Sequence, residues 1–221
     1  MNVREETVAI PVGKIQLAGT LRTPEHADSI VLFAHGSGSS RFSPRNRQVA
    51  AVLERAGLAT MLIDLLSESE EREDSRTGAL RFDIPLLADR LLAATVWLHA
   101  NEGTSSLPLG FFGASTGAGA ALLAAAGRPE LVKAVVSRGG RPDLAGKALR
   151  YVSAPTLLIV GERDAVVLDL NQRAAAEIAT KCKLEIIPGA THLFEEPGAL
   201  EVVAALARDW FSLHLAGRAT S

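Results

Sequence analysis

Residues 111–120 read Phe-Phe-Gly-Ala-Ser-Thr-Gly-Ala-Gly-Ala and place one serine, Ser115, inside the pattern Gly-x-Ser-x-Gly. An apolar stretch precedes this motif and an alanine-rich stretch follows it, which predicts a buried strand that turns into a helix. Such a sharp turn needs small neighbours and pushes the central hydroxyl out of the sheet edge, where it can act as a nucleophile. The alternative is that small residues merely let a helix pack closely against a strand, and the motif alone leaves both interpretations open.

Short apolar runs alternate with helical patterns along the chain. The runs expected as strands are 30–34, 59–63, 107–112, 131–136, 156–160 and 184–187. Apolar spacing and helix-start signals predict helices over about 44–57, 83–100, 168–178 and 199–215. Residues 6–21 read as two antiparallel strands around a turn. The charged stretch 67–81 is expected to be an exposed loop or irregular segment, and the polar tail 216–221 a frayed end.

This alternation predicts the α/β class, with a mostly parallel central sheet flanked by helices on both faces. Ligands bind such sheets outside the carboxyl ends of the strands, so the loops that follow the strands are where a site is expected. The connections leave no room for a large lid domain. We therefore expect residues 1–221 to form a single domain.

Composition narrows the classes of function. Lys and Arg number 23 against 25 Asp and Glu, a formal net charge of −2, so binding of nucleic acid has little electrostatic support. No apolar run is long enough to cross a membrane, and the amino-terminal residues lack a signal-peptide pattern. The single cysteine, Cys182, allows no internal disulfide, and a cytoplasmic location is expected. The five histidines are scattered, so we expect no metal site.

A serine hydroxyl becomes a good nucleophile only with a base to take its proton and a third group to orient that base. Two predicted strands downstream run into such groups, Asp164 and His192. The order Ser, Asp, His along the chain is the order found in enzymes with a nucleophile elbow. Each residue also has a simpler interpretation. Asp164 could be a solvated loop residue or a helix cap, Glu162 could be the acid instead, and His192 could be an ordinary surface histidine.

The loop after the strand 30–34 is rich in glycine and serine and is the expected source of an oxyanion-binding amide. Acyl transfer creates a negatively charged oxygen that needs two backbone N–H donors. Thr116, the residue after the serine of the motif, and Ser37 are the expected donors, because glycines beside Ser37 let the backbone approach a substrate. His35 is expected to hold this loop in place. The alternative is a plain glycine–serine loop.

These motifs together resemble the α/β-hydrolases of the dienelactone-hydrolase-like family. The resemblance spans nearly the whole chain and rests on Phe33-Ala34-His35-Gly36, Gly113-Ala114-Ser115-Thr116-Gly117, Gly161-Glu162-Arg163-Asp164 and Thr191-His192. It implies an α/β-hydrolase fold of about eight strands, no cofactor, and hydrolysis of esters or lactones. It also implies Ser115 as nucleophile, His192 as base, Asp164 as acid, and Ser37 and Thr116 as oxyanion donors.

This chain departs from the family pattern at the nucleophile. The named dienelactone hydrolases carry cysteine in the elbow, whereas this chain carries serine and its single cysteine lies elsewhere. Ester hydrolysis is therefore a firmer expectation than lactone specificity. Residues 36–41 also resemble small hydrolase domains that are sometimes fused to phosphoribosyltransferases.

Three arginines lie in loops that face the expected site. Arg41 follows the glycine–serine loop, and Arg138 and Arg141 follow the strand that should neighbour the nucleophile strand. A guanidinium group in any of these places could pair with a carboxylate on the substrate. The alternative is that these arginines tie loops together through carbonyls or aspartates such as Asp143.

The leading hypothesis is a serine carboxylesterase that acts on a small-molecule ester. A second hypothesis keeps the same three residues in an acyltransferase or a thioesterase. A third is a non-catalytic binding module on a hydrolase scaffold. No membrane or nucleic-acid partner is expected, and no pattern in the sequence sets an oligomeric state.

Overall fold

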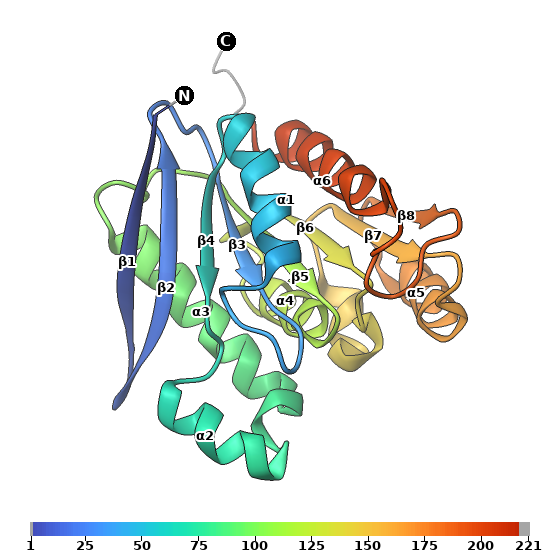
Figure 1. Ribbon diagram of the computed structural model, residues 1–221, viewed down its shortest axis with the longest axis horizontal. Helices are drawn as coiled ribbons and strands as arrows, with labels where there is room; N and C mark the ends of the chain where they lie inside the picture. Colours follow the sequence, from blue (N-terminus) through green and yellow to red (C-terminus); the bar gives the residue numbers. More distant parts are fainter. Residues whose placement is uncertain (1, 217–221) are drawn as a thin grey trace.

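Eight strands form one sheet in the order β1-β2-β4-β3-β5-β6-β7-β8 in the computed structural model, which describes residues 2–216 (Figure 1). The strands are β1 (Val3–Val12), β2 (Ile15–Pro24), β3 (Ile30–Ala34), β4 (Ala59–Ile63), β5 (Leu109–Ala114), β6 (Val132–Arg138), β7 (Thr156–Gly161) and β8 (Cys182–Ile187). The helices are α1 (Pro44–Arg55), α2 (Glu68–Thr77), α3 (Ile84–Ala100), α4 (Thr116–Gly127), α5 (Ala165–Glu177) and α6 (Ala199–Leu215), with 3-10 segments η1 (Leu80–Phe82) and η2 (Pro142–Tyr151).

The sheet is parallel from β4 through β3, β5, β6 and β7 to β8, and antiparallel where β1 and β2 join it. This confirms the expected α/β class and mostly parallel sheet. Every residue of β3, β4, β5 and β7 is buried, because helices cover both faces of the parallel part. The carboxyl ends of these strands therefore meet at one edge of the sheet, where their loops converge.

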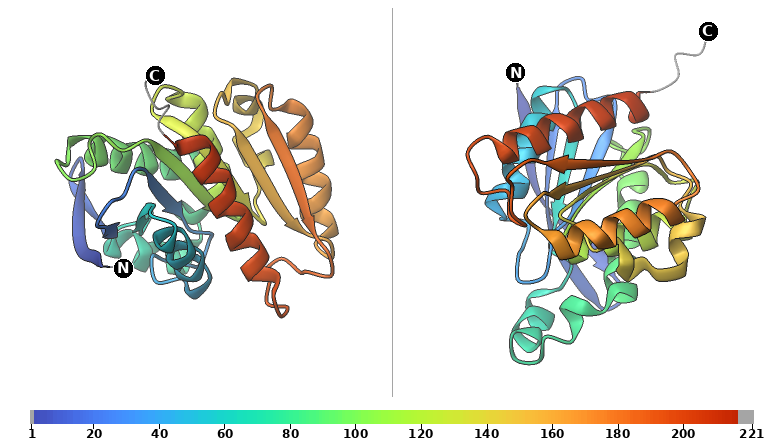
Figure 2. Two further views of the ribbon diagram at one scale, coloured as in Figure 1. Left: turned by 90° about the horizontal axis from the view of Figure 1, so that it is seen from above. Right: turned by 90° about the vertical axis from the view of Figure 1, so that its right-hand side faces the viewer.

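Two apolar clusters, one on each face, hold the helices to the sheet. Helices α1 and α6 pack over one face, and α3, α4 and α5 lie on the other (Figure 2). On the α1/α6 face, the rings of Phe33 and Phe112 lie 4.8 Å apart between neighbouring strands. This pair packs β3 against β5, the two strands whose following loops carry Ser37 and Ser115.

Residues 67–81, expected to be a loop, form the helix α2 and the turn η1, so that prediction was wrong. Ser67 and Glu70 form a capping box, in which the Ser67 hydroxyl accepts from the Glu70 N–H and the Glu70 carboxylate accepts from the Ser67 N–H. Asp74 is fully buried and accepts from the Leu80 N–H at 2.6 Å and from Arg81. Polar contacts thus stabilise this helix. It has almost no apolar face, so the apolar pattern of the sequence did not predict it.

Several boundaries differ from the expected ones. Strand β5 runs to Ala114, not to residue 112, and β6 runs to Arg138, not to residue 136. The structure also contains η2, which was not expected, and the helix expected over 168–178 begins at Ala165. The longer strands bring Ser115 directly to the end of β5 and place Arg138 inside the sheet. Of the tail expected to be frayed, residues 217–221 lie outside the described residues.

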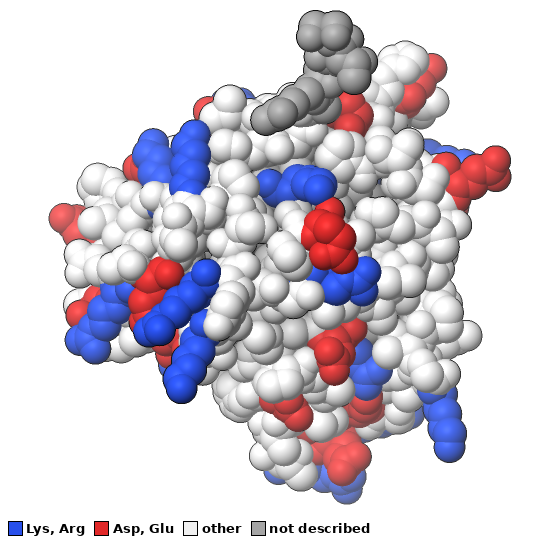
Figure 3. All heavy atoms as spheres, turned by 180° about the vertical axis from the view of Figure 1, so that it is seen from behind, with Lys and Arg blue, Asp and Glu red and all other residues white. Residues whose placement is uncertain are grey.

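Acidic and basic side chains are interspersed on the face of the molecule shown in Figure 3. This mixing matches the near balance of 23 basic and 25 acidic residues. Within residues 2–216, no helix combines the length and the apolar character needed to cross a bilayer.

Replacing Ser67 with alanine should destabilise the protein by about 1 kcal/mol, because the Glu70 N–H loses its cap. Unfolding in urea would measure this change. Ser75→Ala is a matched control within α2, since Ser75 is exposed and bonds only to the Arg72 carbonyl among the described residues. We expect the control to stay within about 0.5 kcal/mol of wild type, and equal effects of the two substitutions would contradict the capping role.

Candidate active site

Ser115 lies between β5 and α4 in a backbone conformation that L-residues rarely adopt. Its φ is 50° and its ψ is −123°, which costs on the order of 1–3 kcal/mol. The turn leaves no space for side chains on either side. A Cβ atom on Gly113 would overlap Ala118, and one on Gly117 would overlap the carbonyl oxygens of Ala34 and His35. The Gly-x-Ser-x-Gly pattern is therefore required by the packing, as the motif predicted.

Hydrogen bonds from the neighbouring loop hold the strained residue. The Ser115 N–H donates to the Arg138 carbonyl at 3.2 Å, and the Ser115 carbonyl accepts from the N–H groups of Ala118 and Arg141 at 3.0 Å. The loop after β6 thus fixes the turn from one side while α4 fixes it from the other. Such contacts keep a strained conformation populated.

Asp164 and His192 meet at the same edge of the sheet, although 28 residues separate them. His192 Nδ1 and Asp164 Oδ2 lie 2.6 Å apart, and the two side chains are 39% and 15% exposed. Because a carboxylate only accepts, the proton of neutral His192 sits on Nδ1, and Nε2 is left as an acceptor. This is the tautomer that a base beside a serine needs.

The two simpler interpretations of the acidic residues find less support. Asp164 occupies the position before α5, but its side chain makes no capping hydrogen bond. Glu162 accepts from the Gly189 N–H at 2.7 Å, so its carboxylate binds the loop after β8. Of the two, Asp164 is the carboxylate that contacts His192.

Gly139 brings the His192 ring to the segment that supports Ser115. A Cβ atom on Gly139 would lie 3.1 Å from the His192 carbonyl oxygen and 3.5 Å from its Cε1 atom. Gly139 follows Arg138, whose carbonyl accepts from the Ser115 N–H. Among the described residues, the Ser115 hydroxyl and His192 do not form a hydrogen bond. Catalytic hydrogen bonds often form fully only when substrate binds.

Phe194 anchors the loop that carries His192, a role that the sequence analysis missed. Its backbone has φ 55° and its side chain is 1% exposed. The ring packs into the cluster between the sheet and α6 and lies beside Gly139. The signal in the sequence was weak, because one aromatic residue in a loop does not reveal where it is buried.

The loop after β3 is held by His35, as expected. The buried ring accepts from the Leu65 N–H through Nε2 at 3.1 Å, so Nδ1 donates to the Gly36 carbonyl at 2.9 Å. Burial lowers the pKa of His35 below its ordinary value, which keeps the ring neutral and suited to both contacts. A Cβ atom on Gly36 would lie 3.0 Å from Ser115 Cβ, so this loop passes directly over the turn.

Ser37 and Thr116, the expected oxyanion donors, lie next to each other. The Ser37 N–H donates to the Thr116 hydroxyl at 2.9 Å. The Thr116 N–H belongs to the first residue of α4 and has no acceptor within that helix. Two backbone donors therefore lie close together beside Ser115, and one of them already has an acceptor.

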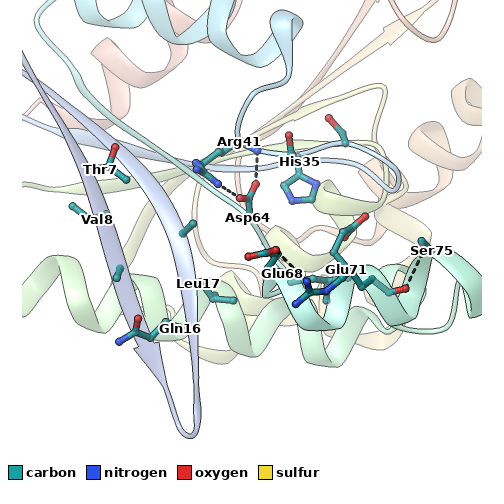
Figure 4. Close-up of a pocket in the computed structure, with 16 residues that line it drawn as sticks. Thr7, Val8, Gln16, Leu17, His35, Arg41, Asp64, Glu68, Glu71 and Ser75 are labelled. Atoms are coloured by element: carbon teal, nitrogen blue, oxygen red, sulfur yellow. Dashed lines mark hydrogen bonds and ion pairs between the residues drawn. The ribbon is translucent and has the colours of Figure 1, made fainter.

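The three arginines have different partners. Arg41 pairs with Asp64, on the wall of a cavity of about 850 Å³ between the β1–β2 hairpin and α2 (Figure 4). Arg141 forms two hydrogen bonds with the Asp143 carboxylate, at 2.8 and 2.7 Å. These contacts favour the interpretation that Arg41 and Arg141 tie loops together. Arg138 is buried and donates to no side chain or carbonyl among the described residues.

Two other kinds of site, a metal centre and a thiol nucleophile, find little support in the part of the chain that the structure describes. Within residues 2–216, no group of three His, Cys, Asp or Glu side chains is arranged to hold a metal ion. Cys182 begins β8, at the end of that strand away from His192, and burial raises the pKa of its thiol to about 11. It is therefore a poor nucleophile at neutral pH.

Comparisons with known proteins show which family and fold the chain shares. Residues 27–205 match the family described as an alpha/beta hydrolase domain. The chain is 60% identical to a dienelactone hydrolase from Anabaena variabilis, with a TM-score of 0.95 over 96% of this chain and 99% of that chain. Est1E from Butyrivibrio proteoclasticus shares the fold, with a TM-score of 0.78 at 17% identity over 96% of this chain and 99% of that one.

Two curated proteins, from two strains of Mycobacterium tuberculosis, are 61% identical to the chain over 215 residues. Both relatives are named as phosphoribosyl transferases, an activity that their names mark as not established. The match covers 97% of this chain but 48% of each relative, so the chain spans about half the length of these relatives.

Gly117→Ala should destabilise the protein by about 2 kcal/mol or more, because the new methyl group meets two carbonyl oxygens that cannot move freely. Gly127→Ala is the matched control at the other end of α4, where a Cβ atom has nothing within 4 Å. We expect the control to be about 0.5–1 kcal/mol more stable than wild type. Thermal unfolding would compare the two variants, and a stable Gly117→Ala protein would contradict the packing requirement.

Proposed function

Because the chain belongs to the α/β-hydrolase superfamily and its dienelactone-hydrolase-like family, we propose that it hydrolyses small carboxylic esters through an acyl-enzyme on Ser115. The observation that carries the proposal is the 2.6 Å contact between His192 and Asp164 at the edge where Ser115 is held in a strained turn. A purely structural role would not require a serine with a strained, positive-φ backbone at the same edge as a histidine whose Nδ1 proton is held by an aspartate.

In the first step, His192 Nε2 takes the proton of the Ser115 hydroxyl while Ser115 Oγ attacks the ester carbonyl carbon. The resulting oxyanion replaces the Thr116 hydroxyl as acceptor of the Ser37 N–H and also accepts from the Thr116 N–H. The tetrahedral intermediate then collapses. The bond to the leaving alcohol breaks, and His192 gives its proton to that oxygen.

In the second step, His192 takes a proton from water, whose oxygen attacks the acyl carbon. The bond to Ser115 Oγ breaks, the carboxylic acid leaves, and the proton returns to the serine. Asp164 keeps the proton of neutral His192 on Nδ1 and stabilises the imidazolium that forms in each step. No step requires a cofactor.

Transfer of the acyl group to an acceptor other than water uses the same residues and is the second candidate. The names of the Mycobacterium tuberculosis relatives propose transfer of a phosphoribosyl group, but this chain matches about half of their length. We propose that the region shared with those relatives supplies hydrolysis. The arrangement of Ser115, Asp164 and His192 argues against a binding module, because binding alone does not need an oriented base.

We propose a cytoplasmic location on the basis of Cys182, the single cysteine of the sequence.

Ser115→Ala should lower kcat for 4-nitrophenyl butyrate by a factor on the order of 10⁶, because no nucleophile remains. Circular dichroism and thermal unfolding would establish that the variant is folded. Wild-type turnover by the folded variant would rule out Ser115 as the nucleophile.

Asp164→Asn should lower kcat by about 10⁴-fold, because an amide in this place permits the wrong tautomer of His192. Glu162→Gln is the matched control, since Glu162 bonds to the Gly189 N–H and glutamine can still accept there. We expect the control to keep activity close to wild type under the same assay. If Glu162→Gln were the more damaging change, the acid would be misassigned.

A further inference from the structure

Arg138 is a buried cation with no carboxylate partner within residues 2–216. Its side chain is 8% exposed, and its Nη1 atom is closed off from solvent with no hydrogen-bond partner among the described residues. Arg90, which is 9% exposed, provides a comparison, because its guanidinium contacts the Glu70 carboxylate at 2.7 Å. A similarly buried guanidinium in the same protein therefore does have a carboxylate partner.

Burying an unpaired charge costs free energy, and this lowers the pKa of a buried cation. Burial, and after it the positive charge of Arg45, lower the pKa of Arg138 to about 10. The side chain still carries its charge at neutral pH. An anion that approached it would remove the unsatisfied donor and the repulsion from Arg45 together.

The Arg138 side chain projects on the same face of the sheet as α1 and α6. Side chains alternate along a strand, and Ala134 and Val136 of β6 both pack in the cluster on that face. Arg138 is the next residue in this series. It is also the partner of Ala114 in the register between β5 and β6, so it sits directly beside the residue before Ser115.

Arg45 completes a positive region on this face. It is the second residue of α1, where the unpaired N–H groups and the helix dipole favour anions. Its Nε atom is also buried without a partner among the described residues, and its Nη1 lies 3.4 Å from Glu195 of the His192 loop. That distance leaves a weak ion pair, which a ligand can replace.

We propose that Arg138 and Arg45 form an anion subsite beside Ser115, so that the ester substrate carries a carboxylate or phosphate group. The substrate part of this proposal rests on the proposed ester hydrolysis, whereas binding of an anion does not. Either group matches the fork of donors on a guanidinium. Arg41 and Arg141 are already paired with aspartates, whereas Arg138 forms no ion pair among the described residues.

The kinetic test compares mono-4-nitrophenyl succinate with 4-nitrophenyl butyrate, which have acyl chains of equal length but differ in the terminal carboxylate. Arg138→Gln should lower the ratio of kcat/KM for the succinate to that for the butyrate by about tenfold or more, as expected for one charged hydrogen bond. The loss should appear mainly as a higher KM for the succinate.

Arg138→Lys, which keeps the charge, should recover part of the ratio of kcat/KM values. Arg47→Gln, at an exposed position two residues after Arg45 on α1, should leave it unchanged.

Calorimetry on the Ser115→Ala protein tests the subsite without hydrolysis. Titration with succinate and with inorganic phosphate should show binding of at least one anion, and the tighter one identifies the group that the subsite prefers. Adding Arg138→Gln should abolish that binding.

An unchanged kinetic ratio in a folded Arg138→Gln protein, or no binding of either anion, would overturn the subsite. If wild type hydrolysed neither ester, the proposed ester hydrolysis would fail, and the calorimetric result would still decide the anion subsite.

Discussion

The left-handed backbone of Ser115 is the constraint on which the rest of the site depends. This conformation lifts the hydroxyl above the end of β5, and it is possible only because neither Gly113 nor Gly117 carries a side chain. The loop after β3 uses the space above Gly117, and the loop after β6 donates to and accepts from the turn itself. Three separate connections of a parallel sheet are thereby fixed around one residue, and the strain is balanced by contacts that a looser turn would not make.

The other groups of the site reach that residue through the topology of the sheet. Asp164 and His192 follow β7 and β8, the last two strands in the sheet order, and the loop that carries His192 passes beside Gly139 at the end of β6. Phe194 inserts between the sheet and α6 and holds the second of these loops. A parallel sheet brings residues that are distant in sequence to one edge, and this is how Ser115, Asp164 and His192 come to the same edge of the sheet.

Much of this could be predicted from the sequence, and the failures have physical causes. Strand–helix alternation and the glycines around Ser115 are local signals, so the α/β class and the turn were predictable. Helix α2 was missed because polar contacts at Ser67 and Asp74 stabilise it, whereas apolar periodicity detects only helices with an apolar face. Asp143, named from the sequence as a possible partner, does pair with Arg141 within one loop. The surroundings of Arg41 and Arg138 could not be predicted. Whether the guanidinium groups of Arg41 and Arg138 meet an aspartate depends on segments that are distant in the sequence, and residue spacing does not encode such contacts.

The chain matches about half the length of its Mycobacterium tuberculosis relatives, so its chemistry is best tested on the chain itself. The most direct measurement is labelling with a fluorophosphonate, followed by mass spectrometry of the intact protein and of its peptides. A single adduct on Ser115, absent from the folded Ser115→Ala protein and slowed by Asp164→Asn, is the predicted result. Labelling that persists in Ser115→Ala, or a folded wild-type protein that does not react, would contradict a nucleophilic serine at this turn.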